Sequence, residues 1–456
     1  MYKKKNFKFF LICTFSILAA FIIFSCKTVP ETTVSYTEEL YKLLVENKFD
    51  EAITYYESMP ESLRNEYEMQ KLKVSIYISA GRLDEAFNLC TELLEENSKD
   101  PDLLYIEANI YNARGDEETY ITKLQNIIKL HPKHEEALGD LGDVYLGKKN
   151  YKQAEIYFTK ALSINSRNAN ALTGLGRVKY KSSNFEEALK LLDSALAIDE
   201  TQYIAWADRG KVNYEMGRYK DAIEDVKKSL SYYPDDYFNW FDLATYYLKL
   251  NKKDEALSAL DKAIEINPDY YLPYIYRAGL NDQSGNYEVA KADYNKIIEL
   301  FPDYYYANEC LGILQWHEGL WSEAYKNFYA AYQHNPNQPS YAFMCAACMY
   351  KAGTSSARIK KFLDPVFKNI ERDSLNYYIG RLLYDMTGES DVIFRIQKEN
   401  GKSQKSRALF YLGLYYELKD RKDLALKYYQ EAKDVVIVPS YFEYRFVDWA
   451  LKEAVN

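Results

Sequence analysis

Glycine, proline and histidine are all scarce in this chain of 456 residues. It holds 18 glycines, 12 prolines and four histidines, while nearly half of its residues are apolar. Few helix breakers and a large apolar fraction argue against disorder and favour an ordered helical protein. No glycine-rich phosphate loop, nucleophile elbow or zinc-protease helix is found. His131 and His134 are three residues apart, but without further ligands we interpret them as part of a solvated turn rather than a metal site.

Basic residues are also fewer than acidic residues. The formal net charge is −9, and residues 1–25 contribute four lysines and no acid, so the remaining chain is more acidic still. An acidic body repels phosphate backbones, and we therefore expect no nucleic-acid partner. The carboxylates follow the polar faces of the expected helices and form no catalytic pair. We expect neither an enzyme nor a cofactor.

Beyond residue 26, cysteine is limited to Cys90, Cys310, Cys345 and Cys348. Cys345 and Cys348 form a Cys-x-x-Cys pair, but the βαβ pattern that thioredoxin-like chemistry needs is absent. Only Cys310 could join the pair as a zinc ligand. We expect all four to be small packing residues, with a Cys310–Cys345 disulfide as the first alternative and a metal site as the second.

Residues 1–25 are predicted to be a signal rather than part of the fold. Four lysines precede an apolar run, Phe9 to Phe24, which is short for a membrane span. The run ends in Ile22-Ile23-Phe24-Ser25-Cys26, which resembles a bacterial lipobox: an aliphatic residue three before the cysteine and a small residue directly before it. The resemblance implies that Cys26 becomes a lipidated N-terminus, followed by a polar tether to residue 32. The alternative is an uncleaved signal anchor.

A lipid on Cys26 would hold the protein at a membrane outside the cytoplasm, through acyl chains instead of a spanning helix. Lys27 follows the cysteine. In the enterobacterial sorting rule an aspartate at this place retains lipoproteins at the inner membrane, so the resemblance favours the outer membrane. The periplasmic side and the cell surface both stay open.

What the chain has in abundance is repetition. Prolines recur every 34 residues at Pro234, Pro268, Pro302 and Pro336. Alanines keep the same step at Ala222, Ala256, Ala290 and Ala324. A period of this length is typical of a helical repeat array. Extending the frame gives units that start at Thr33, Tyr67, Pro101, Glu135, Ala169, Tyr203, Tyr237, Tyr271, Tyr305, Pro339, Asp373 and Ser406.

Small residues recur inside these units. Glycine or alanine fills the eighth place in ten units, and alanine fills the twentieth place in nine. This pattern resembles the tetratricopeptide repeat (TPR) family over residues 33 to about 438. The resemblance implies an all-α, right-handed superhelical solenoid of about twelve helix-turn-helix units. In it the small residues lie where the two helices cross, and a glycine in left-handed conformation occupies the turn.

The regularity of the repeat changes along the chain. Residues 33–338 form a regular array. Residues 339–405 are degenerate, because Pro365 interrupts one unit and the unit from Asp373 lacks the alanine and gains two glycines. Its second helix is expected to be short or tilted. Residues 406–456 form the last unit and a capping helix, Tyr441 to Val455, which is expected to cover the exposed apolar face of that unit.

The family resemblance also implies a binding face. In TPR arrays the second, fifth, ninth, twelfth and thirteenth places of the first helix face the ligand. Here these places give a cationic zone of Arg177, Tyr180, Lys181, Lys211 and Tyr214. They also give an aromatic zone of Phe238, Phe241, Ile275, Tyr306, Ile313, Trp316, Phe343 and Tyr350. Such zones fit a protein or peptide segment with acidic and apolar residues.

Other interpretations stay open at this stage. The aromatic residues could pack between units, and Arg177 and Lys181 could pair with acids such as Glu215. We expect a lipid-anchored scaffold of the cell envelope that binds a partner without chemistry. A surface adhesin is the first alternative. An enzyme or sugar-binding protein that uses Trp316 and Phe241 is the second, because the fold class does not choose among such functions.

Overall fold

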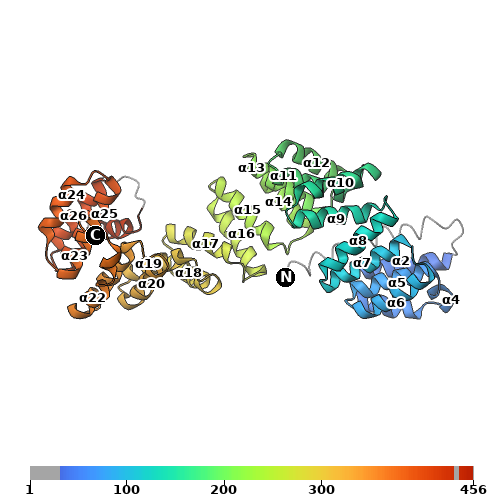
Figure 1. Ribbon diagram of the computed structural model, residues 1–456, viewed down its shortest axis with the longest axis horizontal. Helices are drawn as coiled ribbons and strands as arrows, with labels where there is room; N and C mark the ends of the chain where they lie inside the picture. Colours follow the sequence, from blue (N-terminus) through green and yellow to red (C-terminus); the bar gives the residue numbers. More distant parts are fainter. Residues whose placement is uncertain (1–30, 436–440, 455–456) are drawn as a thin grey trace. The chain divides into compact units, whose positions relative to one another are not determined.

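The computed structural model describes residues 31–435 and 441–454. These residues form helices and no strand (Figure 1). The chain divides into two compact units, residues 1–234 and residues 235–456. We call them unit 1 and unit 2 and describe each by itself.

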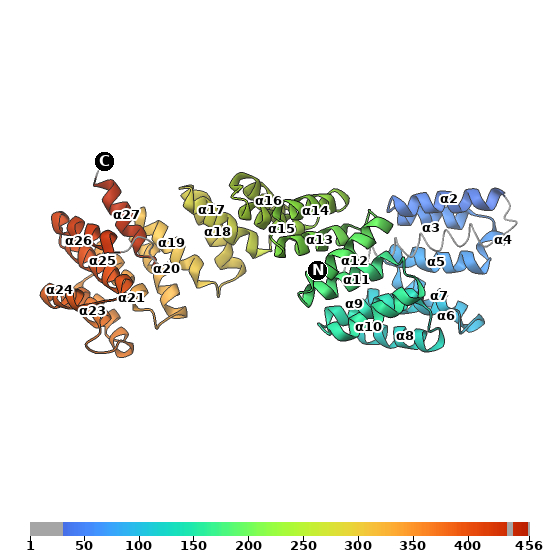
Figure 2. The same ribbon diagram turned by 90° about the horizontal axis from the view of Figure 1, so that it is seen from above.

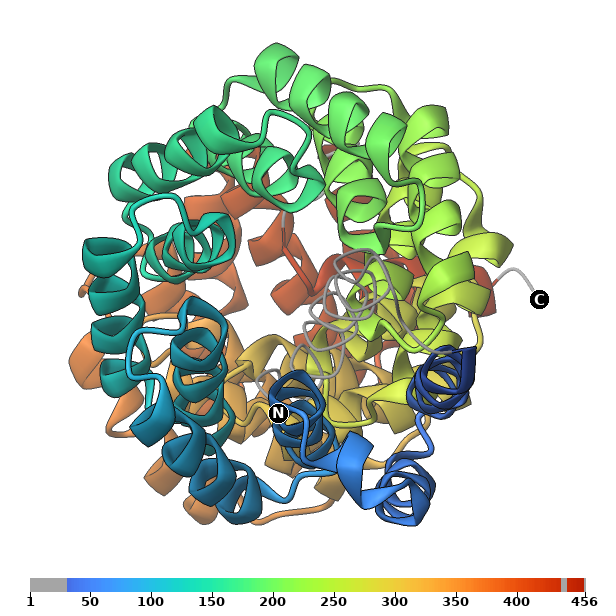
Figure 3. The same cartoon turned by 90° about the vertical axis from the view of Figure 1, so that its right-hand side faces the viewer.

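Unit 1 is a stack of helical hairpins that follow one another along the chain (Figure 3). Its first helices are α2 Glu31–Val45, α5 Tyr67–Ser79, α7 Pro101–Arg114, α9 Glu135–Gly147, α11 Ala169–Lys181 and α13 Tyr203–Glu215. Its second helices are α3 Phe49–Ser58, α6 Leu83–Glu96, α8 Glu117–Leu130, α10 Tyr151–Ile164, α12 Phe185–Ile198 and α14 Tyr219–Tyr232. One extra turn, α4 Glu61–Arg64, follows Pro60 and was not predicted.

Unit 2 continues the pattern. Its first helices are α15 Tyr237–Lys249, α17 Tyr271–Gln283, α19 Tyr305–His317, α21 Pro339–Lys351, α23 Leu375–Asp385 and α25 Lys402–Leu418. Its second helices are α16 Lys253–Ile266, α18 Tyr287–Leu300, α20 Trp321–His334, α22 Ser356–Leu363, α24 Glu389–Lys398 and α26 Lys422–Val435. A 3-10 turn, η1 Val366–Asn369, follows α22, and the C-terminal helix is α27 Tyr444–Glu453.

The predicted repeat frame agrees closely with these bounds. Every predicted unit start from Tyr67 to Pro339 is the first residue of a helix. In the region predicted to be degenerate, α22 ends at Leu363 before Pro365, and α24 spans only ten residues. The all-α fold class and the array of helical hairpins are confirmed.

Small residues allow the two helices of a hairpin to approach. A Cβ atom on Gly142 would lie 2.6 Å from the ring of Phe158, and one on Gly176 would lie 2.9 Å from Leu192. These distances are shorter than any tolerated carbon–carbon contact, so a larger side chain would push the helices apart. The predicted role of the eighth place is confirmed at these positions.

The turns inside the hairpins require a left-handed residue. Six glycines have φ between 73° and 81° there: Gly81, Gly115, Gly217, Gly285, Gly319 and Gly353. Where glycine is missing, other residues take the same conformation with φ of 57° to 59°: Asn47, Lys149, Ser183, Asn251 and Asp420. The turn geometry is therefore kept even where a side chain makes it costly.

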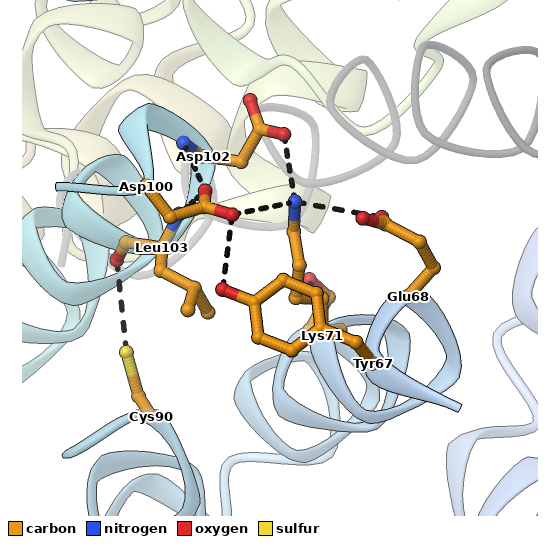
Figure 4. Close-up of polar contacts among 8 residues, drawn as sticks. Tyr67, Glu68, Lys71, Cys90, Asp100, Asp102 and Leu103 are labelled. Carbon is orange, nitrogen blue, oxygen red and sulfur yellow. Dashed lines mark hydrogen bonds and ion pairs between the residues drawn. The ribbon is translucent and has the colours of Figure 1, made fainter. Parts of the chain in front are cut away.

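Polar contacts join successive hairpins as well. Lys71 of α5 is only 2% exposed, and its Nζ lies 2.8 Å from Asp102 and 3.4 Å from Asp100 (Figure 4). Asp100 in turn caps α7, because its Oδ1 accepts from the backbone N–H groups of Asp102 and Leu103. A buried ammonium that is paired in this way links α5 to the N-terminus of α7.

The C-terminal helix α27 does more than cap the last hairpin. It packs on α25 and α26, as predicted, but it also lies against α19 (Figure 2). It begins three residues later than predicted, at Tyr444. Its contacts with earlier repeats were not foreseen from the sequence.

Candidate partner-binding faces

In unit 1, the structure brings the predicted basic residues together, but acids accompany them. Arg177 Nε lies 3.1 Å from Asp208 Oδ2, and Arg177 Nη1 lies 3.8 Å from Asp143 Oδ1. Lys211 Nζ lies 3.9 Å from the other oxygen of Asp208. The face is therefore mixed in charge and not simply cationic as predicted. An acidic ligand would have to compete with Asp208 for the same cations.

The other members of the predicted cationic zone pack near their own hairpins. The Tyr180 ring is half-buried and lies 6.0 Å from the Phe185 ring of α12. Lys181 is exposed, with its Nζ 5.1 Å from the centre of the Tyr180 ring. The Tyr214 ring is half-buried, 5.5 Å from the Tyr219 ring of α14. Packing between helices accounts for these tyrosines better than an open binding surface does.

Unit 2 carries two groups of aromatic side chains on neighbouring repeats. The Phe241 ring of α15 lies 5.2 Å from the Tyr276 ring of α17 and 5.6 Å from that of Tyr270. Phe238 is also 5.2 Å from Tyr270. The second group lies at the start of α19, where the Tyr304 ring is 5.8 Å from the Tyr306 ring. Tyr276 of the first group is close enough to Tyr304 to affect its pKa. We call Phe238, Phe241, Tyr270, Tyr276, Tyr304 and Tyr306 the aromatic face.

Two residues of the aromatic face are open to solvent. Tyr276 is 40% exposed and Tyr306 is 49% exposed. The other four are half-buried. Burial, together with the nearby Cys310 and Tyr276, raises the pKa of the Tyr304 phenol above its usual value. The Tyr304 phenol therefore stays a neutral hydrogen-bond donor at physiological pH.

The sequence identified three of these six residues. Phe238, Phe241 and Tyr306 hold family ligand places, whereas Tyr276 holds a sixth place. Tyr270 and Tyr304 both precede the first residue of a unit and are 34 residues apart. That spacing was the signal that could have identified them.

The remaining aromatic candidates are packing residues, contrary to the prediction. Phe343 is 1% exposed and lies 5.5 Å from the Tyr411 ring. Trp316 is 9% exposed and lies against Trp321 and Phe446. The Tyr350 hydroxyl donates a 2.8 Å hydrogen bond to the carbonyl oxygen of Leu383. Later helices cover these positions, which a regular array would leave open.

The predicted hydrophobic packing of the cysteines agrees with their burial. Cys90, Cys345 and Cys348 are buried and Cys310 is half-buried, and all four are free thiols. Burial raises the pKa of both Cys90 and Cys310 to about 12. His134 caps α9, since its Nδ1 accepts from the N–H of Ala137.

Residues 31–435 and 441–454 contain no group of three or more His, Cys, Asp or Glu side chains that could hold a metal ion. Over the same ranges no helix is both long and apolar enough to cross a membrane. The predicted signal and the lipidation site Cys26 lie outside the described residues.

Several solved structures resemble this chain. YrrB, described as a TPR protein with an unusual peptide-binding site, is 26% identical, with 41% of this chain and 97% of that chain covered and a TM-score of 0.33. PilF of Pseudomonas aeruginosa is 21% identical, with 45% and 94% covered and a TM-score of 0.41. The C-terminal part of a TPR protein from Cytophaga hutchinsonii is 16% identical, with 60% and 98% covered and a TM-score of 0.38.

No curated protein matches the chain. Sequence models described as tetratricopeptide repeat do match, over residues 102–134, 121–171, 148–208, 213–277 and 282–341. These matches agree with the repeat frame, with the glycines where helices cross and with the stacked hairpins. The chain therefore belongs to the tetratricopeptide repeat family.

Proposed function

We propose that this protein is a lipid-anchored scaffold outside the cytoplasm that captures a protein or peptide partner on the aromatic face. Stacked repeats present an extended surface that a partner segment can follow. The mechanism is docking on a preformed surface, with no bond made or broken. The role we propose is in the assembly of the cell envelope.

One observation carries the proposal: Tyr276 and Tyr306 are large, exposed and set among further aromatic rings. Exposed aromatic rings are unfavourable in water, and their presence among further aromatic side chains is typical of a binding surface. Tyrosine also offers a hydroxyl for a hydrogen bond beside its apolar ring. The partner we expect has apolar side chains that lie against these rings. Acidic residues of the partner are expected to contribute less to binding, because Asp208 already pairs with Arg177.

The test is a crosslinking pull-down from the native envelope. The double variant Tyr276→Ala with Tyr306→Ala should reduce partner capture about tenfold or more, since two interface anchors are lost. Tyr329→Ala is the matched control, because this tyrosine is 36% exposed but lies on the second helix α20. The control should capture as the wild type does. Undiminished capture by the folded double variant would contradict the proposal.

The anchor is tested separately. The support for it is the lipobox-like sequence that ends at Cys26. Metabolic palmitate labelling should be strong in the wild type and absent after Cys26→Ala. If labelling persists in the variant, the anchor is wrong, whatever the aromatic face binds. Protease treatment of intact cells then decides between a periplasmic scaffold, which is spared, and a surface adhesin, which is removed.

A further inference from the structure

The C-terminal helix α27 binds a distant part of its own repeat array. The guanidinium of Arg445 donates two hydrogen bonds, both 2.8 Å, to the two carboxylate oxygens of Asp282 at the end of α17. These residues are 163 positions apart. A bidentate pair of this kind fixes the orientation of the helix as well as its position.

Aromatic contacts extend the same interface. Phe446 is 5% exposed, and its ring lies 5.6 Å from Trp316 of α19 and 5.8 Å from Phe410 of α25. One helical turn later, Trp449 stacks on His317 of α19, with centroids 4.0 Å apart and planes 18° apart. Arg445, Phe446 and Trp449 therefore form a single recognition surface along one side of α27.

The receiving residues occupy first-helix places near the end of each helix. Asp282 is the twelfth residue of its unit, and Trp316 and His317 are the twelfth and thirteenth residues of the next. Equivalent places in successive repeats thus contact α27, and we call the surface formed by Asp282, Trp316 and His317 the groove. An amphipathic helix in a groove is a common mode of peptide recognition.

A pocket of about 560 Å³ that is open to solvent lies beside α27, and its lining includes Phe446 and Trp449 as well as Trp316, Trp321 and Phe410. One side of α27 therefore borders an open pocket and not a closed core. The distal end of the helix is held by the Trp449 stack, by Asp448, 2.7 Å from Lys433 Nζ of α26, and by Glu453, 3.7 Å from His317. These two ion pairs lie at the protein surface. By contrast, Glu443, just before the helix, is fully buried and accepts a hydrogen bond from Tyr411.

We propose that this groove is a binding site for an amphipathic helix that carries an arginine and aromatic residues one and four places after it. Helix α27 is the resident occupant, and a partner helix of that chemistry binds by displacing it from Tyr444 onward. The turn at Glu443 stays attached. This site is distinct from the aromatic face, and its test does not need the partner of the proposed function.

The experiment measures binding of a fluorescent peptide with the sequence of residues 444–456 to the full chain. The wild type should bind it weakly, because α27 occupies the groove. Arg445→Glu should bind it at least about tenfold more tightly, since the resident helix loses a charged, doubly hydrogen-bonded pair while Asp282 remains for the peptide. A peptide with glutamate in place of its arginine should lose that gain.

A matched control separates displacement from general loosening. Arg277→Glu breaks a similar bidentate pair, with Asp293, that does not contact α27, and its peptide binding should equal that of the wild type. If Arg277→Glu gains as much peptide affinity as Arg445→Glu does, the proposal is overturned. It is also overturned if Arg445→Glu binds the peptide no more tightly than the wild type. Trp449→Ala is the second opening variant. If neither opening variant folds, as judged by circular dichroism, α27 is an integral part of the core and the proposal is wrong.

Discussion

The hydroxyl group of Tyr120 donates a 2.6 Å hydrogen bond to Asp140, whose side chain is buried between α7, α8 and α9. Tyr105 donates a second bond, of 2.9 Å, to the same oxygen. Burial raises the pKa of Asp140 to about 7, although both phenols favour the ionised form. A carboxyl group that ionises near neutral pH is thus part of the interface between two hairpins.

This arrangement predicts a pH-dependent stability. Between about pH 4 and pH 7 the unfolded chain releases the Asp140 proton while the folded chain keeps it, so stability falls as pH rises, by at most about 1.4 kcal/mol per pH unit. Asp140→Asn keeps an oxygen for both phenols and should remove this dependence. The measurement is the hydrogen-exchange rate of the α9 amides in the variant and in the wild type. The ratio of the two rates should differ between pH 5 and pH 8. An unchanged ratio would exclude Asp140 as the cause.

Two glycines on the same helix α9 should respond in opposite ways to substitution. Gly142→Val should destabilise unit 1 by about 1–3 kcal/mol, because the added atoms overlap the Phe158 ring. Gly139→Ala should stabilise it by about 0.5–1 kcal/mol, since nothing lies within 4 Å of the added carbon and alanine favours helix. Thermal unfolding of both variants gives the comparison. Equal destabilisation would mean that the crossing of α9 and α10 does not need a small residue.

The thiols should be unreactive until the protein unfolds. Cys90, Cys345 and Cys348 are buried, and burial raises their pKa. Without reductant, iodoacetamide at pH 8 should leave these three unmodified in the native protein and label them, with Cys310, in denaturant. Peptide mass spectrometry reads out each site. If Cys310 and Cys345 both escape labelling in denaturant, they form the disulfide that the sequence left as an alternative.

Local rules in the sequence determined the repeat architecture. From Tyr67 to Pro339 the starts of the first helices recur at 34-residue intervals. Left-handed turn glycines and small residues where helices cross recur in the same frame. They repeat because each hairpin meets the same neighbours in the same way, so a periodic pattern is a sufficient description of its packing. Phe238, Phe241 and Tyr306 were predicted from the family resemblance, which implies that their places in the repeat face the ligand.

The contacts that break this periodicity were decided only by the tertiary structure. Arg177 lies beside Asp208, and the sequence offers no reason to choose that acid over its many neighbours. Arg445 pairs with Asp282 because α27 returns to helices formed more than a hundred residues earlier. Such a return depends on where the stacked helices end in space, which no local pattern encodes. For that reason Trp316, predicted to be open, is covered, because α27 brings Phe446 against it.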